Sequence, residues 1–82
     1  MTFRSSLVTF AKNRALDHLW DKHQCTLRPD MTPILRRSIK QELTDYPLIT
    51  EAELSVIGYR ALDYLVLKFG IELVGKSAGK EK

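Results

Sequence analysis

Apolar residues recur every three or four positions in three long segments of this 82-residue chain, and that spacing restricts it to a mainly helical fold. The first segment runs from about residue 2 to residue 23 with no Gly or Pro inside it. The second begins at Thr32-Pro33, where Thr can cap a free backbone N–H and Pro suits the first helical position. It is expected to end at Tyr46-Pro47, because proline cannot continue a helix.

The third segment carries the clearest local signal, a capping box at Thr50 and Glu53 in which each side chain accepts a hydrogen bond from the other's backbone N–H. The helix is expected from about residue 51 to residue 69, with Gly70 as its stop. Gly58 in mid-helix costs about 1 kcal/mol relative to Ala and indicates either a close helix crossing or a break into two shorter helices. Its many apolar positions predict the central, most buried helix: Leu54, Val56, Ile57, Ala61, Leu62, Leu65, Val66, Leu67 and Phe69.

The fold class predicted from these segments is a compact, mainly α domain of three to four helices. The short apolar stretch at 71–74 is expected to be a brief strand or a docked extended piece. Residues 1–75 are expected to form this single domain and residues 76–82 a flexible basic tail. Cys25 is the only cysteine, so no internal disulfide supports the fold. No apolar run reaches the roughly 20 residues of a membrane span and no signal peptide is evident, so a soluble cytoplasmic protein is expected.

Charge is distributed unevenly along the chain. Residues 1–40 hold eight Lys and Arg against three Asp, a net charge of +5. Residues 41–75 hold two Lys and Arg against six Asp and Glu, a net charge of −4. A separation of this kind predicts one face positive enough to attract a polyanion such as nucleic acid.

Basic residues around the second segment are the leading candidates for contact with phosphate: Arg28, Arg36, Arg37 and Lys40. Arg36 and Lys40 are one helical turn apart, and Arg outnumbers Lys in the group, which suits bidentate contact with phosphate. A solvated helix face is the alternative explanation of the group. Tyr59 and Arg60, beside Gly58, are candidates for stacking on a base and holding a phosphate, although Tyr on so apolar a helix is more often part of the core.

Residue types that bind metals gather near the end of the first segment, at Asp17, His18, Asp21, His23 and Cys25. Their spacing matches no common zinc motif, and two His five residues apart on one helix point in different directions. A nucleophilic Cys needs a base, an orienting group and an oxyanion site, and the sequence arranges none of these. No metal, cofactor or small-molecule substrate is therefore predicted, and the chain is not expected to be an enzyme.

Several short motifs follow one another in an order found in a known family. They are Arg14-Ala15-Leu16-Asp17-His18-Leu19, Cys25, Arg28-Pro29 with Ile34, Ile49-Thr50-Glu51-Ala52-Glu53-Leu54, and Tyr64-Leu65. In this order they resemble the ProQ/FinO family of RNA chaperones over most of the chain. The resemblance implies binding of structured RNA, notably a hairpin base with its 3′ single-stranded end. It also implies that Arg28 is the basic residue before the motif's proline, that Arg36 or Arg37 follows on the next helix, and that Tyr59 or Arg60 stands near the RNA.

The sequence thus predicts a nucleic-acid-binding regulator, with RNA preferred over DNA, that acts through the basic face of the second helix. The alternative is a helical protein-binding adaptor or inhibitor, of phage, plasmid or Hha type, or a homo-oligomer. Its interface would be an exposed apolar stripe on the first helix, at Phe3, Phe10 and Trp20, or a stripe on the third helix.

Overall fold

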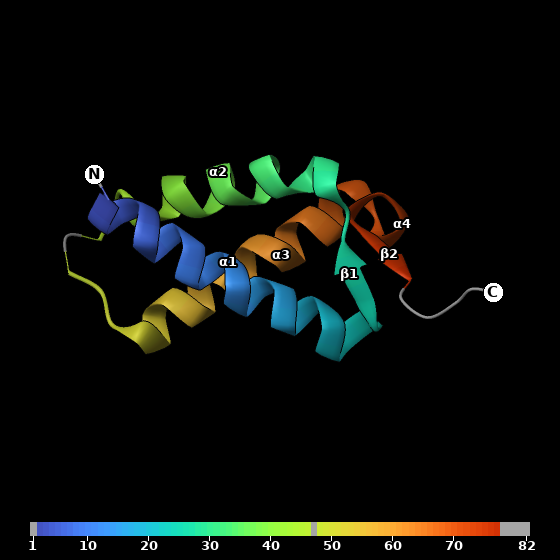
Figure 1. Ribbon diagram of the computed structural model, residues 1–82, viewed down its shortest axis with the longest axis horizontal. Coiled ribbons are helices and arrows are strands. Elements are labelled where there is room, and N and C mark those ends of the chain that lie inside the picture. The colour runs from blue at the N-terminus through green and yellow to red at the C-terminus, as the bar shows by residue number, and fades with distance from the viewer. Residues whose placement is uncertain (1, 47, 78–82) are drawn as a thin grey trace.

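Three long helices and a short two-stranded sheet make up the protein (Figure 1) in a computed structural model that describes residues 2–46 and 48–77. The long helices are α1 (Thr2–His23), α2 (Thr32–Leu43) and α3 (Glu51–Phe69). The short elements are β1 (Cys25–Leu27), the 3₁₀ turn η1 (Pro29–Met31), α4 (Ile71–Val74) and β2 (Gly75–Ser77). The prediction of a mainly helical domain is confirmed.

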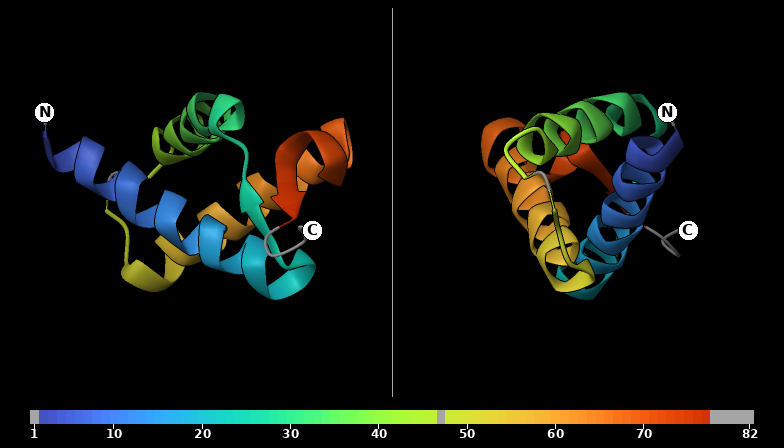
Figure 2. Two further views of the ribbon diagram at one scale, coloured as in Figure 1. Left: turned by 45° about the vertical axis from the view of Figure 1, so that its right-hand side comes forward. Right: turned by 90° about the vertical axis from the view of Figure 1, so that its left-hand side faces the viewer.

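The three long helices form the sides of a triangle when the molecule is viewed along its length, as the right-hand view of Figure 2 shows. The described part measures 45 × 20 × 19 Å, so each helix presents a long outer face to solvent. No polar or charged residue of the described part is buried. The core between the helices consists of apolar side chains from all of them: Val8, Ala11, Ala15, Leu19, Cys25, Met31, Leu35, Ile39, Leu43, Leu54, Ile57, Ala61, Leu62, Leu65 and Val74.

Gly58 marks a close crossing of α1 and α3, and α3 is continuous through it. A Cβ atom at this position would collide with the carbonyl oxygen of Ala11 and lie 3.4 Å from the backbone nitrogen of Ala15. The two alanines on α1 and the glycine on α3 let the two backbones approach until they touch. Of the two explanations of Gly58, the helix crossing is confirmed and the helix break is wrong.

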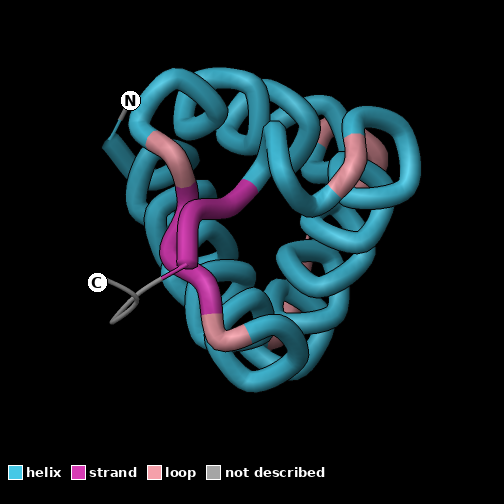
Figure 3. Tube along the Cα trace, turned by 90° about the vertical axis from the view of Figure 1, so that its right-hand side faces the viewer, coloured by secondary structure: helices cyan, strands magenta, loops and turns pink. Residues whose placement is uncertain are grey.

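The short sheet closes the end of the molecule where α1 ends and α2 begins (Figure 3). Strands β1 and β2 are antiparallel, with Leu27 opposite Gly75 and Cys25 opposite Ser77. A side chain at Gly75 would come within 2.9 Å of the Cys25 Cβ, so the glycine permits the pairing. The extended segment is thus 75–77, whereas the stretch 71–74 is one helical turn. Lys76 belongs to β2 rather than to a tail, and residues 78–82 lie outside the described residues.

The start of α2 differs from the expectation. Thr32 does not cap the helix, because the N-cap position is Met31 and no side chain caps it. The turn η1 precedes α2 directly and places the Met31 side chain in the core. Burial of this apolar side chain outweighs the single hydrogen bond that a Thr cap would supply. The helix also ends at Leu43, earlier than Tyr46.

Helix α3 is less deeply buried than its composition predicts. Val56, Leu67 and Phe69 are exposed, because α3 is packed against α1 and α2 on one side only. The described part of the chain contains no helix of the length and apolar character that crossing a membrane requires. The apolar residues on the outer side of α3 therefore form part of the protein's surface.

The capping box at the start of α3 is present as predicted. The Glu53 N–H donates to Thr50 Oγ1 at 3.2 Å, and the Thr50 N–H donates to Glu53 Oε1 at 3.0 Å. We expect Thr50→Ala to lower the free energy of unfolding by about 1 kcal/mol, since one helical N–H loses its partner. Urea unfolding followed by circular dichroism measures the change. Thr50→Ser keeps the hydroxyl and is the matched control; equal stability of the Ala and Ser variants would contradict a role for the cap.

Candidate nucleic-acid interface

The basic group on α2 stays together in the structure. Arg37 and Lys40 are exposed, and Arg36 is partly buried. Leu35 and Ile39 point into the core. Residues three and four apart are neighbours on a helix surface, so the three cationic side chains share the outer side of α2.

Helix α1 supplies the rest of this surface. Arg36 Nη1 donates to Thr9 Oγ1 at 3.3 Å, which joins the basic group of α2 to α1. Lys12 follows Thr9 by three residues and therefore lies next to it on α1. Its side chain is partly buried, as expected when the methylene stem covers apolar surface and the ammonium group reaches water. We call the four cationic residues the basic face: Lys12, Arg36, Arg37 and Lys40.

Carboxylates are absent from the two segments that build the basic face. Residues 1–16 and 31–41 hold six Lys and Arg and no Asp or Glu. Figure 1 shows α1 and α2 side by side over the first half of α1. Within the described residues, no ion pair involves a member of the basic face. Cations without carboxylate partners maintain a positive potential that attracts phosphate.

Arg28 lies elsewhere, at the junction of β1 and η1. Its Nε is 3.5 Å from the Asp30 carboxylate, and its backbone N–H donates to the Val74 carbonyl at 3.0 Å. Arg28 lines a pocket with Glu72 and Lys76, beside α4 and β2. The structure therefore does not bring Arg28 into the basic face.

Tyr59 takes part in the packing of α1 against α3. Its ring lies 4.7 Å from the His18 ring, centroid to centroid. His18 Nε2 and Lys22 Nζ lie 3.1 and 3.5 Å from the same Asp63 oxygen. Because His18 occupies one side of the Tyr59 ring, the predicted stacking of Tyr59 on a base has no support in this arrangement.

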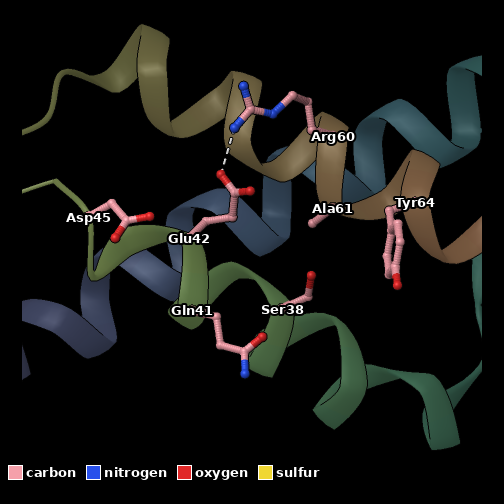
Figure 4. A pocket seen from close by; sticks show the side chains of 7 residues that line it. All are labelled: Ser38, Gln41, Glu42, Asp45, Arg60, Ala61 and Tyr64. Carbon is pink, nitrogen blue, oxygen red and sulfur yellow. Dashed lines mark hydrogen bonds and ion pairs between the residues drawn. The ribbon is translucent and has the colours of Figure 1, made fainter.

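Arg60 is held by a carboxylate in a groove between α2 and α3 (Figure 4). Its Nη2 donates to Glu42 Oε1 at 2.6 Å, and Asp45 and Tyr64 also line the groove. The hydrogen bond to Glu42, then the charge of Glu42 and a hydrogen bond with Tyr46, raise the pKa of the Arg60 guanidinium. The charge of Arg60 is thus balanced by Glu42, and Arg60 lies in the groove between α2 and α3 rather than among the residues of the basic face.

Three of the residues considered as metal ligands, Asp17, His18 and Cys25, make contacts within the fold through their side chains. No group of three His, Cys, Asp or Glu in the described part could hold a metal ion. His18 binds Asp63, as described above. Cys25 is buried, and its Sγ donates to the His23 carbonyl at 3.3 Å. His18 and Cys25 are therefore used in contacts within the fold.

The apolar stripe considered on the first helix is divided. Phe10 packs against the core, and the Arg14 guanidinium lies over its ring at 5.1 Å. Trp20 is exposed, but ten residues after Phe10 it is turned by about 80° around the helix axis. The side chain of Phe3 lies outside the described part. Phe10 and Trp20 therefore do not form one continuous interface.

No family model, curated protein or solved structure matches this chain. The resemblance to ProQ/FinO proteins therefore rests on the short motifs alone. Of the residues that the sequence singled out, Arg36, Arg37 and Lys40 are brought together by the structure, whereas Arg28, Tyr59 and Arg60 each lie in a different contact. Lys12 was missed, although the absence of acidic residues before Asp17 is visible in the sequence.

Proposed function

We propose that this protein is a regulator that binds nucleic acid, RNA in preference to DNA, through the basic face on α1 and α2. The observation that carries the proposal is the concentration of four cations on adjoining helix turns, none of them paired with a carboxylate of residues 2–46 or 48–77. Phosphate contacts supply most of the affinity in non-specific nucleic-acid binding, and they need this kind of surface. The preference for RNA follows from the resemblance to the ProQ/FinO family.

The chemistry of Arg36 and Arg37 suits this role. A guanidinium group donates two parallel hydrogen bonds to a phosphate, and its charge persists at all physiological pH values. The contact with Thr9 holds Arg36 in place before a ligand arrives, so less side-chain freedom is lost on binding. The opposite groove carries Glu42 and Asp45, which would repel phosphate and leave one side of the molecule for the polyanion.

The test compares two double variants with equal loss of charge. In Arg36→Ala/Arg37→Ala, the affinity for single-stranded RNA should fall by about 25-fold at ~0.1 M salt. Two lost contacts reduce the salt slope by about 1.4, and ~0.1 M lies one decade below the ~1 M salt at which this contribution vanishes. Arg28→Ala/Arg60→Ala removes two cations outside the basic face and should bind almost as the parent does. Fluorescence anisotropy of labelled RNA measures both affinities, and thermal melts check folding. An equal loss in the two variants would overturn the placement of the site.

A protein-binding adaptor is the second candidate, and exposed apolar residues on the outer side of α3 and on α4 support the stripe on the third helix as its interface. Leu67 is 85% exposed and Leu73 is 57% exposed, and Val56 lies on the same outer side of α3 as Leu67. Exposed aliphatic residues of this size favour a protein contact. Light scattering of the purified chain, together with the RNA titration, distinguishes the two functions: an oligomer that ignores RNA would favour the adaptor.

A further inference from the structure

Trp20, the only tryptophan of the chain, lies on the last turns of α1 with 43% of its surface exposed. Within the described residues, its ring has no aromatic or cationic partner and its indole N–H has no acceptor. Large aromatic side chains are usually covered or bonded through their polar atom. Trp20 therefore presents a ring face that the fold itself does not use.

The position of Trp20 on α1 continues the basic face. Thr9, Asn13, Leu16 and Trp20 follow at steps of four, three and four residues, which is one side of an α-helix. Thr9 is the residue that accepts the hydrogen bond from Arg36, so this side of α1 adjoins the cations of α2. Trp20 is eight residues beyond Lys12, about 12 Å along the helix axis.

The side of α1 that leads from the basic face to Trp20 is uncharged, because Thr9, Asn13 and Leu16 lie along it. Two exposed carboxylates lie near Trp20: Asp17, three residues earlier, is 3.5 Å from Arg14, and Asp21 follows Trp20 directly in the chain. The Trp20 carbonyl accepts hydrogen bonds from both the N–H and the side-chain amide of Gln24 at 2.9 Å, so the last turn of α1 is closed by two contacts at the residue that carries the ring.

We propose that Trp20 stacks against an unpaired base of a nucleic-acid strand whose phosphates lie along the basic face. The inference rests on the proposed function and adds a preference for a single strand. Aromatic side chains stack on any base, but only on one that has left the duplex stack. A separation of about 12 Å corresponds to three or four nucleotides at the roughly 3.4 Å spacing of a duplex strand, and to fewer in a more extended single strand, so one short strand spans both features.

The single tryptophan makes the contact directly observable. Titration of the unmodified protein with an oligouridylate of about ten nucleotides should quench the Trp20 emission, whereas an RNA duplex should quench it much less. In anisotropy titrations with the same oligouridylate, Trp20→Ala should bind roughly tenfold more weakly, in keeping with the energy of one stacked base. Trp20→Phe keeps an aromatic ring and should recover most of the affinity. Leu67→Ala, at an exposed position of α3, should bind as the parent does.

The outcomes separate this inference from the proposed function. If the unmodified protein binds the oligouridylate by anisotropy but its emission stays unchanged, and if Trp20→Ala binds equally well, the stacking proposal is overturned and the basic face remains. If duplex and single strand bind with the same affinity and the same quenching, the preference for an unpaired base is wrong. If no RNA binds even at low salt, the proposed function fails first.

Discussion

Gly58→Ala is expected to lower the free energy of unfolding by about 2 kcal/mol, although an alanine normally stabilises a helix by about 1 kcal/mol relative to glycine. The added Cβ would collide with the Ala11 carbonyl of α1. The Ala11 carbonyl oxygen belongs to the backbone and cannot rotate out of the way. The cost of overpacking is therefore expected at about 3 kcal/mol, the upper end of its usual range. The collision therefore outweighs the gain in helix propensity.

The measurement is urea unfolding followed by circular dichroism, with a thermal melt beside it. In a domain of this size, about 2 kcal/mol corresponds to a fall of roughly 8–16 °C in the melting temperature. Ala52→Gly is the control, since it makes the reverse exchange at an exposed position of the same helix and should cost no more than about 1 kcal/mol. A Gly58→Ala variant that is as stable as the parent, or more stable, would contradict the close crossing.

The same residue illustrates how far the fold follows from local signals. The bounds of α1 and α3 were predicted closely, because each has strong periodicity and α3 also has its own start and stop signals. The meaning of Gly58 depends on which helix lies opposite it, and no local pattern contains that information. Ala11 and Ala15 of α1 lie against Gly58, and this contact is visible only in the folded structure.

The connection after α1 and the start of α2 were harder to predict for a related reason. After α1, Gln24 adopts a left-handed conformation with φ 56°, which Gln rarely does. Its two hydrogen bonds to the Trp20 carbonyl support this conformation. Before α2, the N-cap position is Met31, whose side chain is buried, and Thr32 does not cap the helix. In both places a contact made in the folded chain overrides the ordinary preference of the residue.

The candidate site was predictable where one helix builds it and unpredictable where two helices meet. Arg36, Arg37 and Lys40 follow from the periodicity of α2 alone. Tyr59 and Arg60 are adjacent in sequence, but successive residues of a helix are turned by about 100°, so Tyr59 meets α1 and Arg60 meets α2. Tyr59 and Arg60 are therefore not placed to act together on one ligand, although their adjacency in the sequence suggested that they could.

The affinity for single-stranded RNA is expected to fall by about 50-fold when salt is raised from about 50 mM to about 200 mM. The basic face offers four cations, and each phosphate contact on a single strand contributes about −0.7 to the slope of log K against log salt, so the slope should be near −2.8. A salt dependence of this size is expected only if the four cations contact the phosphates of the RNA directly. Anisotropy titrations at several salt concentrations measure the slope.

The salt slopes of the two double variants show how many phosphate contacts each pair of residues makes. Arg36→Ala/Arg37→Ala should reduce it to about −1.4, so that the same rise in salt weakens binding only about sevenfold. Arg28→Ala/Arg60→Ala should leave the slope near −2.8, because Asp30 and Glu42 already lie beside those two cations. A slope that is the same for both double variants would show that net charge alone attracts the RNA. A slope near zero in the parent would remove the basis for phosphate recognition by the four cations.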